Sequence, residues 1–155
     1  MITEALSSHE VFSFLQPQQV KAVSDVSEVV SYAEGDAVFR SGEPAVFLYA
    51  VLEGRVSLTL PREEGVNLHI EDLETGALFG SCVCFDFNTY TLTATCAADA
   101  KLLKIGAEEL KSVMEEDPVT GYHVQRMISR TYFTRYLDTM KKLRNIAESL
   151  GLRAG

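Results

Sequence analysis

The segment 47–60 reads FLYAVLEGRVSLTL, and it decides the fold class of this 155-residue chain. Two apolar runs flank the pair Glu53-Gly54, which is a turn signal, and apolar and polar residues alternate over 56–60. A period of two is typical of a strand with one buried face. The segment therefore predicts two β-strands joined by a tight turn.

The same texture continues on both sides of this segment, from residue 29 to residue 105. Short apolar runs alternate with turns rich in Gly, Pro and acidic residues, and no long helical period interrupts them. A parallel sheet with crossover helices is therefore not expected. Many short strands predict a mainly β fold, namely an antiparallel sandwich, a jelly roll or a small barrel. The expected strands cover residues 37–40, 46–52, 55–60, 66–73 and 90–97.

Helical patterns flank this β block. Residues 1–31 predict two short helices followed by a strand, with Pro17 near a helix start. Another helix is expected to begin at Ala107, and the pair Asp117-Pro118 marks a fresh start. Residues 122–150 contain neither Gly nor Pro, which predicts one unusually long helix.

Apolar residues follow one another at steps of three or four along this long helix from Phe133 onward. The spacing is close to the period of about 3.5 residues of a coiled coil. A second copy of the chain is the expected partner, and the alternative is a helix that folds back onto its own β-roll. The chain then divides into a jelly-roll part with N-terminal helices, residues 1–120, and a dimerisation helix, residues 121–155. The predicted interface residues of this homodimer are Phe133, Leu137, Met140, Leu143, Ala147 and Leu150.

Composition and charge limit the function classes. Hydrophobic residues make up 46% and charged residues 23%, as in one soluble globular domain. No apolar run reaches ~18 residues and no signal peptide is evident, so we expect a cytoplasmic protein without a membrane span. Residues 1–120 carry 7 Lys and Arg against 20 Asp and Glu, whereas residues 121–155 carry 7 against 2. The acidic part disfavours nucleic acid, and the basic residues are interpreted as a solvated helix face.

The sequence indicates neither catalysis nor a metal site. His9, His69 and His123 are scattered, without partners at metal-ligand spacing. Nucleophile-elbow, phosphate-loop and dinucleotide motifs are absent, and a metal-dependent jelly-roll enzyme would need more than one His in the strand block. We therefore expect a protein that is not an enzyme and holds no certain cofactor.

The cysteines leave two interpretations open. Cys82 and Cys84 form a Cys-x-Cys pair, and Cys96 lies in an expected strand. A structural zinc or iron–sulfur site usually needs four ligands, and a fourth is not evident. One interpretation is core filling by free cysteines. The other is a cysteine-based redox or metal sensor.

Four segments with glycines at characteristic intervals run through the β block. They are residues 32–44 (YAEGDAVFRSGEP), 47–56 (FLYAVLEGRV), 76–80 (GALFG) and 93–105 (TATCAADAKLLKI). Together they resemble the cyclic nucleotide-binding domain family, that of catabolite activator protein and the kinase regulatory subunits. The resemblance implies a β jelly roll flanked by helices, with a long C-terminal helix that dimerises in the transcription factors. It also implies a regulatory, ligand-binding role in signal transduction.

The resemblance further implies a ligand site in two short segments. The candidate ligand-binding residues are Phe79, Gly80, Ser81, Cys82, Val83, Thr91, Leu92 and Thr93. In the family, a Glu that binds the ribose follows Phe-Gly, and an Arg clamps the cyclic phosphate; these positions are Ser81 and Thr91 here. No Arg or Lys occurs between Arg62 and Lys101, and Asp86 adds negative charge. Losing the charged contact lowers affinity about tenfold to a few hundredfold.

We therefore expect that cAMP and cGMP do not bind in the usual way, unless Arg126 or Arg130 of the long helix supplies the missing cation. The pocket is expected to be polar but uncharged, walled by residues 46–52, 68–73 and 91–95 and closed by the start of the long helix. Such a pocket suits a neutral small molecule or no ligand.

Two further expectations concern ligand and partner. The alternative function is a genuine cAMP or cGMP sensor with an atypical cassette. DNA-binding family members carry a helix-turn-helix beyond the long helix, and the sequence ends at Gly155, so DNA binding by that route is not expected. A regulatory signal would then pass to another protein, which the sequence does not identify.

Overall fold

The computed structural model describes residues 1–151 of the chain. Helices α1 (Ile2–Ser8) and α2 (Pro17–Ser24) come first. The strands are β1 (Ser27–Tyr32), β2 (Ala37–Phe39), β3 (Phe47–Glu53), β4 (Val56–Leu60), β5 (Leu68–Leu73), β6 (Leu78–Phe79), β7 (Thr93–Cys96) and β8 (Ala100–Gly106). A 3-10 turn, η1 (Cys82–Phe85), lies between β6 and β7, and helices α3 (Ala107–Glu116) and α4 (Pro118–Ser149) follow the strands.

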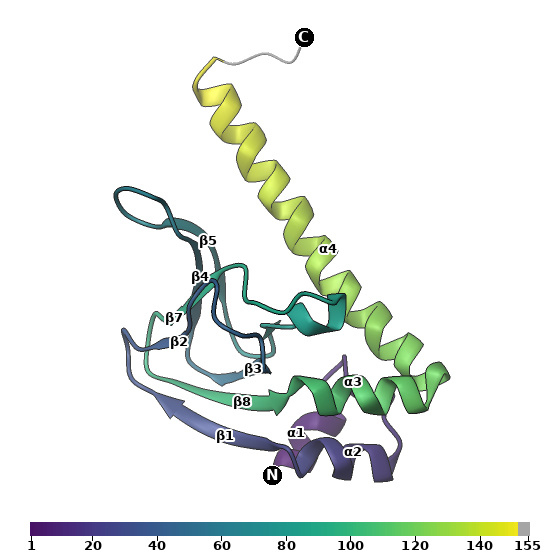
Figure 1. Cartoon of the computed structure of the whole chain (residues 1–155). Coiled ribbons are helices and arrows are strands. Elements are labelled where there is room, and N and C mark those ends of the chain that lie inside the picture. Colours follow the sequence, from purple (N-terminus) through teal and green to yellow (C-terminus); the bar gives the residue numbers. More distant parts are fainter. Residues whose placement is uncertain (152–155) are drawn as a thin grey trace.

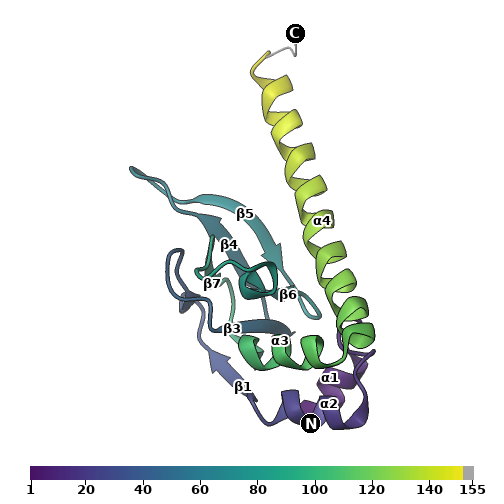
Figure 2. The same cartoon turned by 45° about the vertical axis from the view of Figure 1, so that its right-hand side comes forward.

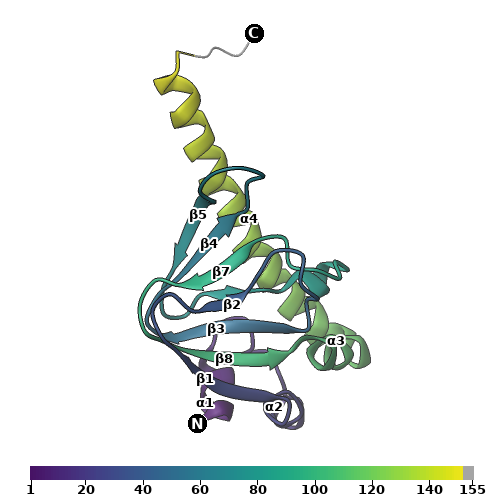
Figure 3. The same cartoon turned by 60° about the vertical axis from the view of Figure 1, so that its left-hand side comes forward.

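The strands form two antiparallel four-stranded sheets that pack face to face (Figure 3). One sheet has the order β1-β8-β3-β6 and the other β2-β7-β4-β5, so neighbours in space are often distant in sequence. This arrangement confirms the predicted jelly roll. The expected strand at 90–97 is shorter than predicted, because Tyr90 forms backbone hydrogen bonds with the loop at Gly42 and Glu43 instead of with a neighbouring strand.

The turn at Gly54 illustrates how local sequence fixes the topology. Gly54 has a φ of +90°, and a Cβ at this position would overlap the carbonyl oxygen of Asp99. Only glycine combines that backbone conformation with so close an approach. The turn therefore joins β3 and β4 where the chain passes directly against the β7–β8 connection.

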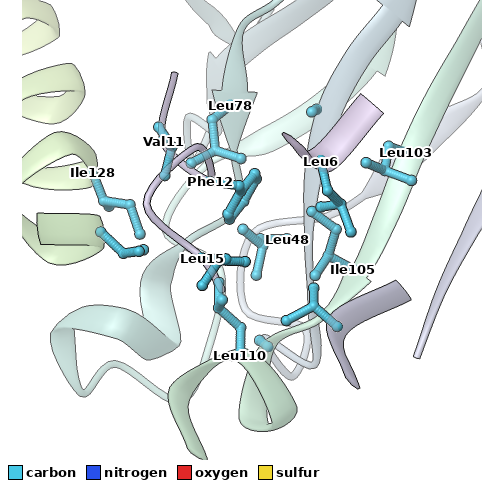
Figure 4. Close-up of a cluster of buried hydrophobic side chains, with 14 of the residues drawn as sticks. Leu6, Val11, Phe12, Leu15, Leu48, Leu78, Leu103, Ile105, Leu110 and Ile128 are labelled. Carbon is cyan, nitrogen blue, oxygen red and sulfur yellow. The ribbon is translucent and has the colours of Figure 1, made fainter. Parts of the chain in front are cut away.

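Two apolar clusters stabilise the molecule. The first lies between the sheets and includes Phe39, Tyr49 and Phe79. The second lies between the β3/β8 sheet and the helices, where Phe12 and Leu110 meet strand residues such as Leu48 (Figure 4). Because α1, α2, α3 and the start of α4 all pack against this second cluster, the helices and the roll form one body.

Helix α4 begins within the core and then leaves it. The Asp117 carboxylate accepts hydrogen bonds from the backbone N–H and the hydroxyl of Thr120, and Pro118 occupies the first turn, as the sequence predicts. Val124 and Ile128 are fully buried in the second cluster. Beyond them the helix runs past the roll beside the β4–β5 hairpin and projects away from it (Figures 1 and 2). Between residues 1 and 151, no helix has both the length and the apolar character that a membrane crossing requires.

Candidate functional site

A pocket of about 310 Å³ lies between the jelly roll and α4. The β4–β5 sheet, the end of β6, the segment before β7 and the middle of α4 each contribute side chains to it. Its walls are mainly apolar and aromatic. The lining residues are Phe39, Leu58, Ile70, Glu71, Phe79, Gly80, Cys82, Thr91, Leu92, Tyr132, Arg135, Tyr136 and Thr139.

Arg135 of α4 and Glu71 of β5 are the charged members of this lining. Arg135 Nε lies 3.0 Å from Glu71 Oε2, and the two side chains are only 14% and 28% exposed. Arg135 Nη2 donates to the carbonyl oxygen of Leu78, and the guanidinium lies 5.1 Å from the centre of the Tyr132 ring. Nη1 is buried and forms no hydrogen bond within the part of the chain that the structure describes. The pocket therefore contains a neutralised cation with unused donor capacity.

The turn after β6 carries the second set of polar contacts to α4. Gly80 has a φ of +77°, and a Cβ there would lie 3.2 Å from the Phe39 ring, so glycine lets the turn pass close to the aromatic wall. The backbone N–H of Ser81 donates to the Tyr132 hydroxyl at 3.0 Å. Gln125 Nε2 donates to the carbonyl oxygen of Cys84 at 3.1 Å. Helix α4 is therefore attached to the backbone of the turn that borders the pocket.

Burial keeps the phenol at this contact neutral. Desolvation raises the pKa of Tyr132, although the positive charge of Arg135 and the hydrogen bond with Ser81 oppose the shift. Ser81 itself is fully buried. Its hydroxyl lies beside the Tyr132 phenol but lacks a hydrogen bond of good geometry to any described residue.

The structure brings five of the eight predicted ligand residues to the pocket, namely Phe79, Gly80, Cys82, Thr91 and Leu92. The other three lie elsewhere. Ser81 bonds to Tyr132, Val83 packs in the second apolar cluster, and the Thr93 hydroxyl accepts a hydrogen bond from the backbone of Ser41. These three positions therefore shape the turn and the strand beside the pocket.

The predicted character of the pocket is wrong in two respects. Its walls are more apolar than expected, and Glu71 and Arg135 place charges in it. Strand β4 supplies a wall residue where 46–52 was expected to do so, and the middle rather than the start of α4 covers the pocket. The reason is that α4 crosses the roll obliquely, so its first turns pack on the helical core instead.

The expectation that the pocket lacks a cation is wrong, because Arg135 of α4 lines it; neither Arg126 nor Arg130, the two exceptions that the sequence offered, does so. Arg130 lines a neighbouring groove beside His9 that shares Glu71 and Arg135 with the pocket, and Arg126 is exposed. Arg135 follows the buried Val124 by 11 residues and Ile128 by seven, which at ~3.6 residues per turn places it on the same side of the helix. Helical periodicity extended from those two residues was the signal that could have identified it.

Asp86 and the cysteines lie apart from the charged part of the site. Asp86 is exposed and pairs with Lys111 at 2.9 Å, so it adds no charge to the pocket lining. Burial raises the pKa of the Cys84 thiol to about 11, which disfavours the reactive thiolate. Cys96 is buried in the core between the sheets. Residues 1–151 contain no cluster of three or more His, Cys, Asp or Glu that could hold a metal ion.

The predicted interface side of α4 faces solvent in this single chain. Phe133 is 60% exposed and Leu143 57% exposed, while Ala147 is half-buried. The exposed apolar residues of this stripe are Phe133, Leu137, Met140, Leu143 and Leu150. The helix contacts its own roll with one side and leaves the stripe on another.

Comparison with known proteins gives the same fold. Residues 29–117 match the family model for the cyclic nucleotide-binding domain. The "CRP-like cAMP-activated global transcriptional regulator" of Mycobacterium tuberculosis is 23% identical over 127 residues. The match covers 82% of this chain and 57% of that regulator, so the chain spans less than two thirds of its relative. A cAMP-dependent protein kinase regulatory subunit of Blastocladiella emersonii is 27% identical over 96 residues, which are 62% of this chain and 24% of the subunit.

Two of the solved structures that share this architecture illustrate the likeness. The sensor domain of the transcriptional regulator DNR from Pseudomonas aeruginosa superposes with a TM-score of 0.75 and 24% identity, covering 86% of this chain and 90% of that domain. The regulatory subunit of a cAMP-independent protein kinase A from Trypanosoma brucei gives a TM-score of 0.72 and 18% identity, covering 90% of this chain and 49% of the subunit. At these identities the likeness concerns the fold.

Proposed function

Because the chain belongs to the cyclic nucleotide-binding domain family, we propose that it is a non-enzymatic regulatory module whose pocket controls helix α4. In this proposal it does not bind cAMP or cGMP in the usual way. The observation that carries it is that α4 covers the pocket and also bonds to the turn beside it through Tyr132, Arg135 and Gln125. A ligand in this space would lie against Tyr132 and Arg135, two of the side chains that make those contacts.

The contacts between α4 and the roll support a coupling between the pocket and the position of the helix. Tyr132 and Gln125 bond to the backbone at Ser81 and Cys84, and Arg135 bonds to Leu78. All three bonds join a side chain of α4 to backbone groups of one short stretch of chain. A ligand that binds better when these bonds are rearranged would shift the position of the helix, as a two-state regulator requires.

The charge pattern supports a pocket unsuited to a cyclic phosphate. The ribose-binding position is Ser81, which is buried against α4, and the phosphate-binding position is the uncharged Thr91. Arg135 is already paired with Glu71. A phosphate would have to compete with that carboxylate, and placing two anions on one cation in an apolar site is unfavourable.

Calorimetry with cAMP and cGMP tests this part of the proposal. We expect no binding tighter than about 10 µM to the wild-type protein. Thr91→Arg restores a cation at an exposed position of the pocket rim and should tighten cAMP binding at least about tenfold. Thr89→Arg, an exposed position outside the pocket lining, is the matched control and should leave affinity unchanged. Tight cAMP binding by the wild type would favour the alternative of a genuine cyclic-nucleotide sensor.

We further propose that the module acts as a homodimer through the apolar stripe of α4 and passes its signal to a partner protein. The exposed large apolar residues on one side of a projecting helix support this, because contiguous apolar surface usually marks an interaction site. Leu137→Glu would place a charge in the interface and should weaken the dimer at least about tenfold in sedimentation experiments. Asn145→Glu introduces the same charge at an exposed position outside the stripe and should leave the dimer intact. A wild-type monomer at all concentrations would contradict the proposal.

A further inference from the structure

Arg135, which lines the pocket, has one side-chain donor without a hydrogen-bond partner among the described residues. Arg135 uses Nε for Glu71 and Nη2 for Leu78, and its buried Nη1 has no partner among residues 1–151. A buried donor of a charged group that stays unpaired is unfavourable by about 1–3 kcal/mol or more. An acceptor atom of a bound molecule that reached this donor after a small shift of the Arg135 side chain would therefore be stabilised.

The charge balance of the pocket decides what kind of acceptor fits. Among the lining residues, the positive charge of Arg135 is neutralised by Glu71 at 3.0 Å. Two adjoining hollows share Glu71 and Arg135 with the pocket, and their other charged side chains are exposed and lie outside this lining. They are Glu10, Asp72, Glu74, Arg130, Asp138, Lys141 and Lys142. An anionic ligand would therefore add an uncompensated negative charge beside Glu71, whereas a neutral carbonyl oxygen would not.

The residues that form the pocket walls indicate the size and polarity of the rest of the ligand. Phe39 and Phe79 lie with ring centres 5.9 Å apart, and Tyr132 and Tyr136 add two rings from α4. Leu58, Ile70 and Leu92 complete an apolar lining. A space of about 310 Å³ is at the lower end of small-molecule sites, which span about 300–1,000 Å³. Such walls favour a compact, flat and largely apolar molecule.

We infer that the natural ligand is an uncharged, aromatic or similarly apolar small molecule whose carbonyl-type oxygen accepts a hydrogen bond from Arg135 Nη1. This inference rests on the proposed function, because it names the ligand class of the same pocket. In it, the Glu71–Arg135 pair stays intact and selects against acids of the same shape. Glu71 is thus a specificity-determining residue and Arg135 is the contact residue.

Three probes of nearly equal shape separate the contribution of the hydrogen bond from that of ligand charge. They are methyl naphthyl ketone, the hydrocarbon isopropenylnaphthalene and the anion naphthoate. The chain contains no tryptophan, so naphthyl fluorescence can be followed with little protein background. We expect the wild-type protein to bind the ketone about tenfold more tightly than the hydrocarbon, since a hydrogen bond to a charged donor is lost in the latter. The ketone should also bind more tightly than naphthoate.

Variants of Glu71 and Arg135 should change which of these probes binds most tightly. Glu71→Gln leaves Arg135 without its counter-charge and should raise naphthoate affinity at least about tenfold. Glu74→Gln, an exposed acid of the turn that follows β5, does not line the pocket and should behave as wild type. The double variant Glu71→Gln/Arg135→Gln keeps the charge balance and should bind ketone and hydrocarbon equally. Circular dichroism of each variant establishes that the fold persists.

The possible outcomes are decisive. Equal affinity of the wild type for ketone and hydrocarbon, preference for naphthoate, or no binding of any probe up to about 1 mM would each overturn the inference. Micromolar binding of cAMP together with the ketone preference would contradict the proposed function but support the ligand class. Absence of cAMP binding without any ketone preference would overturn the ligand class alone.

Discussion

The hydrogen bond between Tyr132 and Ser81 allows one contact between α4 and the pocket turn to be measured in isolation. Tyr132→Phe removes only the hydroxyl and keeps the ring that packs edge-on to Phe85 at 5.3 Å and under the Arg135 guanidinium. The backbone N–H of Ser81, in a fully buried residue, then loses its partner. Leaving a buried donor unpaired is unfavourable by about 1–3 kcal/mol, so we expect the free energy of unfolding to fall by that amount.

Urea unfolding measures this loss, and amide hydrogen exchange at Ser81 localises it. We expect faster exchange at Ser81 in the variant, since the N–H is released from α4. Tyr136→Phe is the matched control: it is on the same helix and lines the same pocket, but its hydroxyl forms no hydrogen bond to a described residue. That control should lie within about 0.5 kcal/mol of wild type. If Tyr132→Phe is equally silent and Ser81 exchange is unchanged, the attachment of α4 to the pocket turn is refuted.

Three further expectations concern the cysteine, the alkaline limit and a glycine turn. Since burial raises the pKa of Cys84 to about 11 from an ordinary 9.0, alkylation of Cys84 near neutral pH should be about a hundredfold slower in the folded chain than in urea, as followed by peptide mass spectrometry. Burial also raises the pKa of Tyr90 to about 12. The unfolded chain loses these protons first, so the unfolding free energy should be greatest below about pH 9 and fall between about pH 9 and 12, and a flat profile would contradict this. Gly54→Ala should destabilise the protein by about 2 kcal/mol or more in urea melts, because the Cβ meets Asp99, whereas Gly35→Ala, with the same φ of +90° and open space around it, should have about half that effect or less.

The fold was predictable because its signals are local. The alternation over 56–60 and the turn at Gly54 predict two successive strands without any knowledge of the rest of the chain, although β3 and β4 do not pair with each other and belong to different sheets. Asp117 and Pro118 mark the start of α4 in the same way. The order of strands within the sheets, such as β8 between β1 and β3, was not predicted, since no local pattern encodes it and the family resemblance gave only the jelly-roll class.

The site was predictable only where it lies on one continuous segment. Gly80 and Thr91 line the pocket as expected because the turn and the following strand carry them there together. The Glu71–Arg135 pair was missed because its members are 64 residues apart and meet only through the oblique path of α4. The apolar spacing along α4 indicated the solvent-exposed stripe. Arg135 lies instead on the side of the helix that continues from the buried Ile128.

The position of the pocket along α4 has a mechanical consequence. Gly121 packs so closely on α3 that a Cβ would overlap the carbonyl oxygen of Met114, which makes this end of the helix a natural fulcrum. At ~1.5 Å per residue, Tyr132 lies about 17 Å from Gly121 and Ser149 about 42 Å. A tilt that moves Tyr132 by about 1 Å therefore displaces Ser149 by about 2.5 Å. In the proposed function, the helix would work as a lever with a gain between two and three, so that a small adjustment at the pocket would become a larger displacement at its far end.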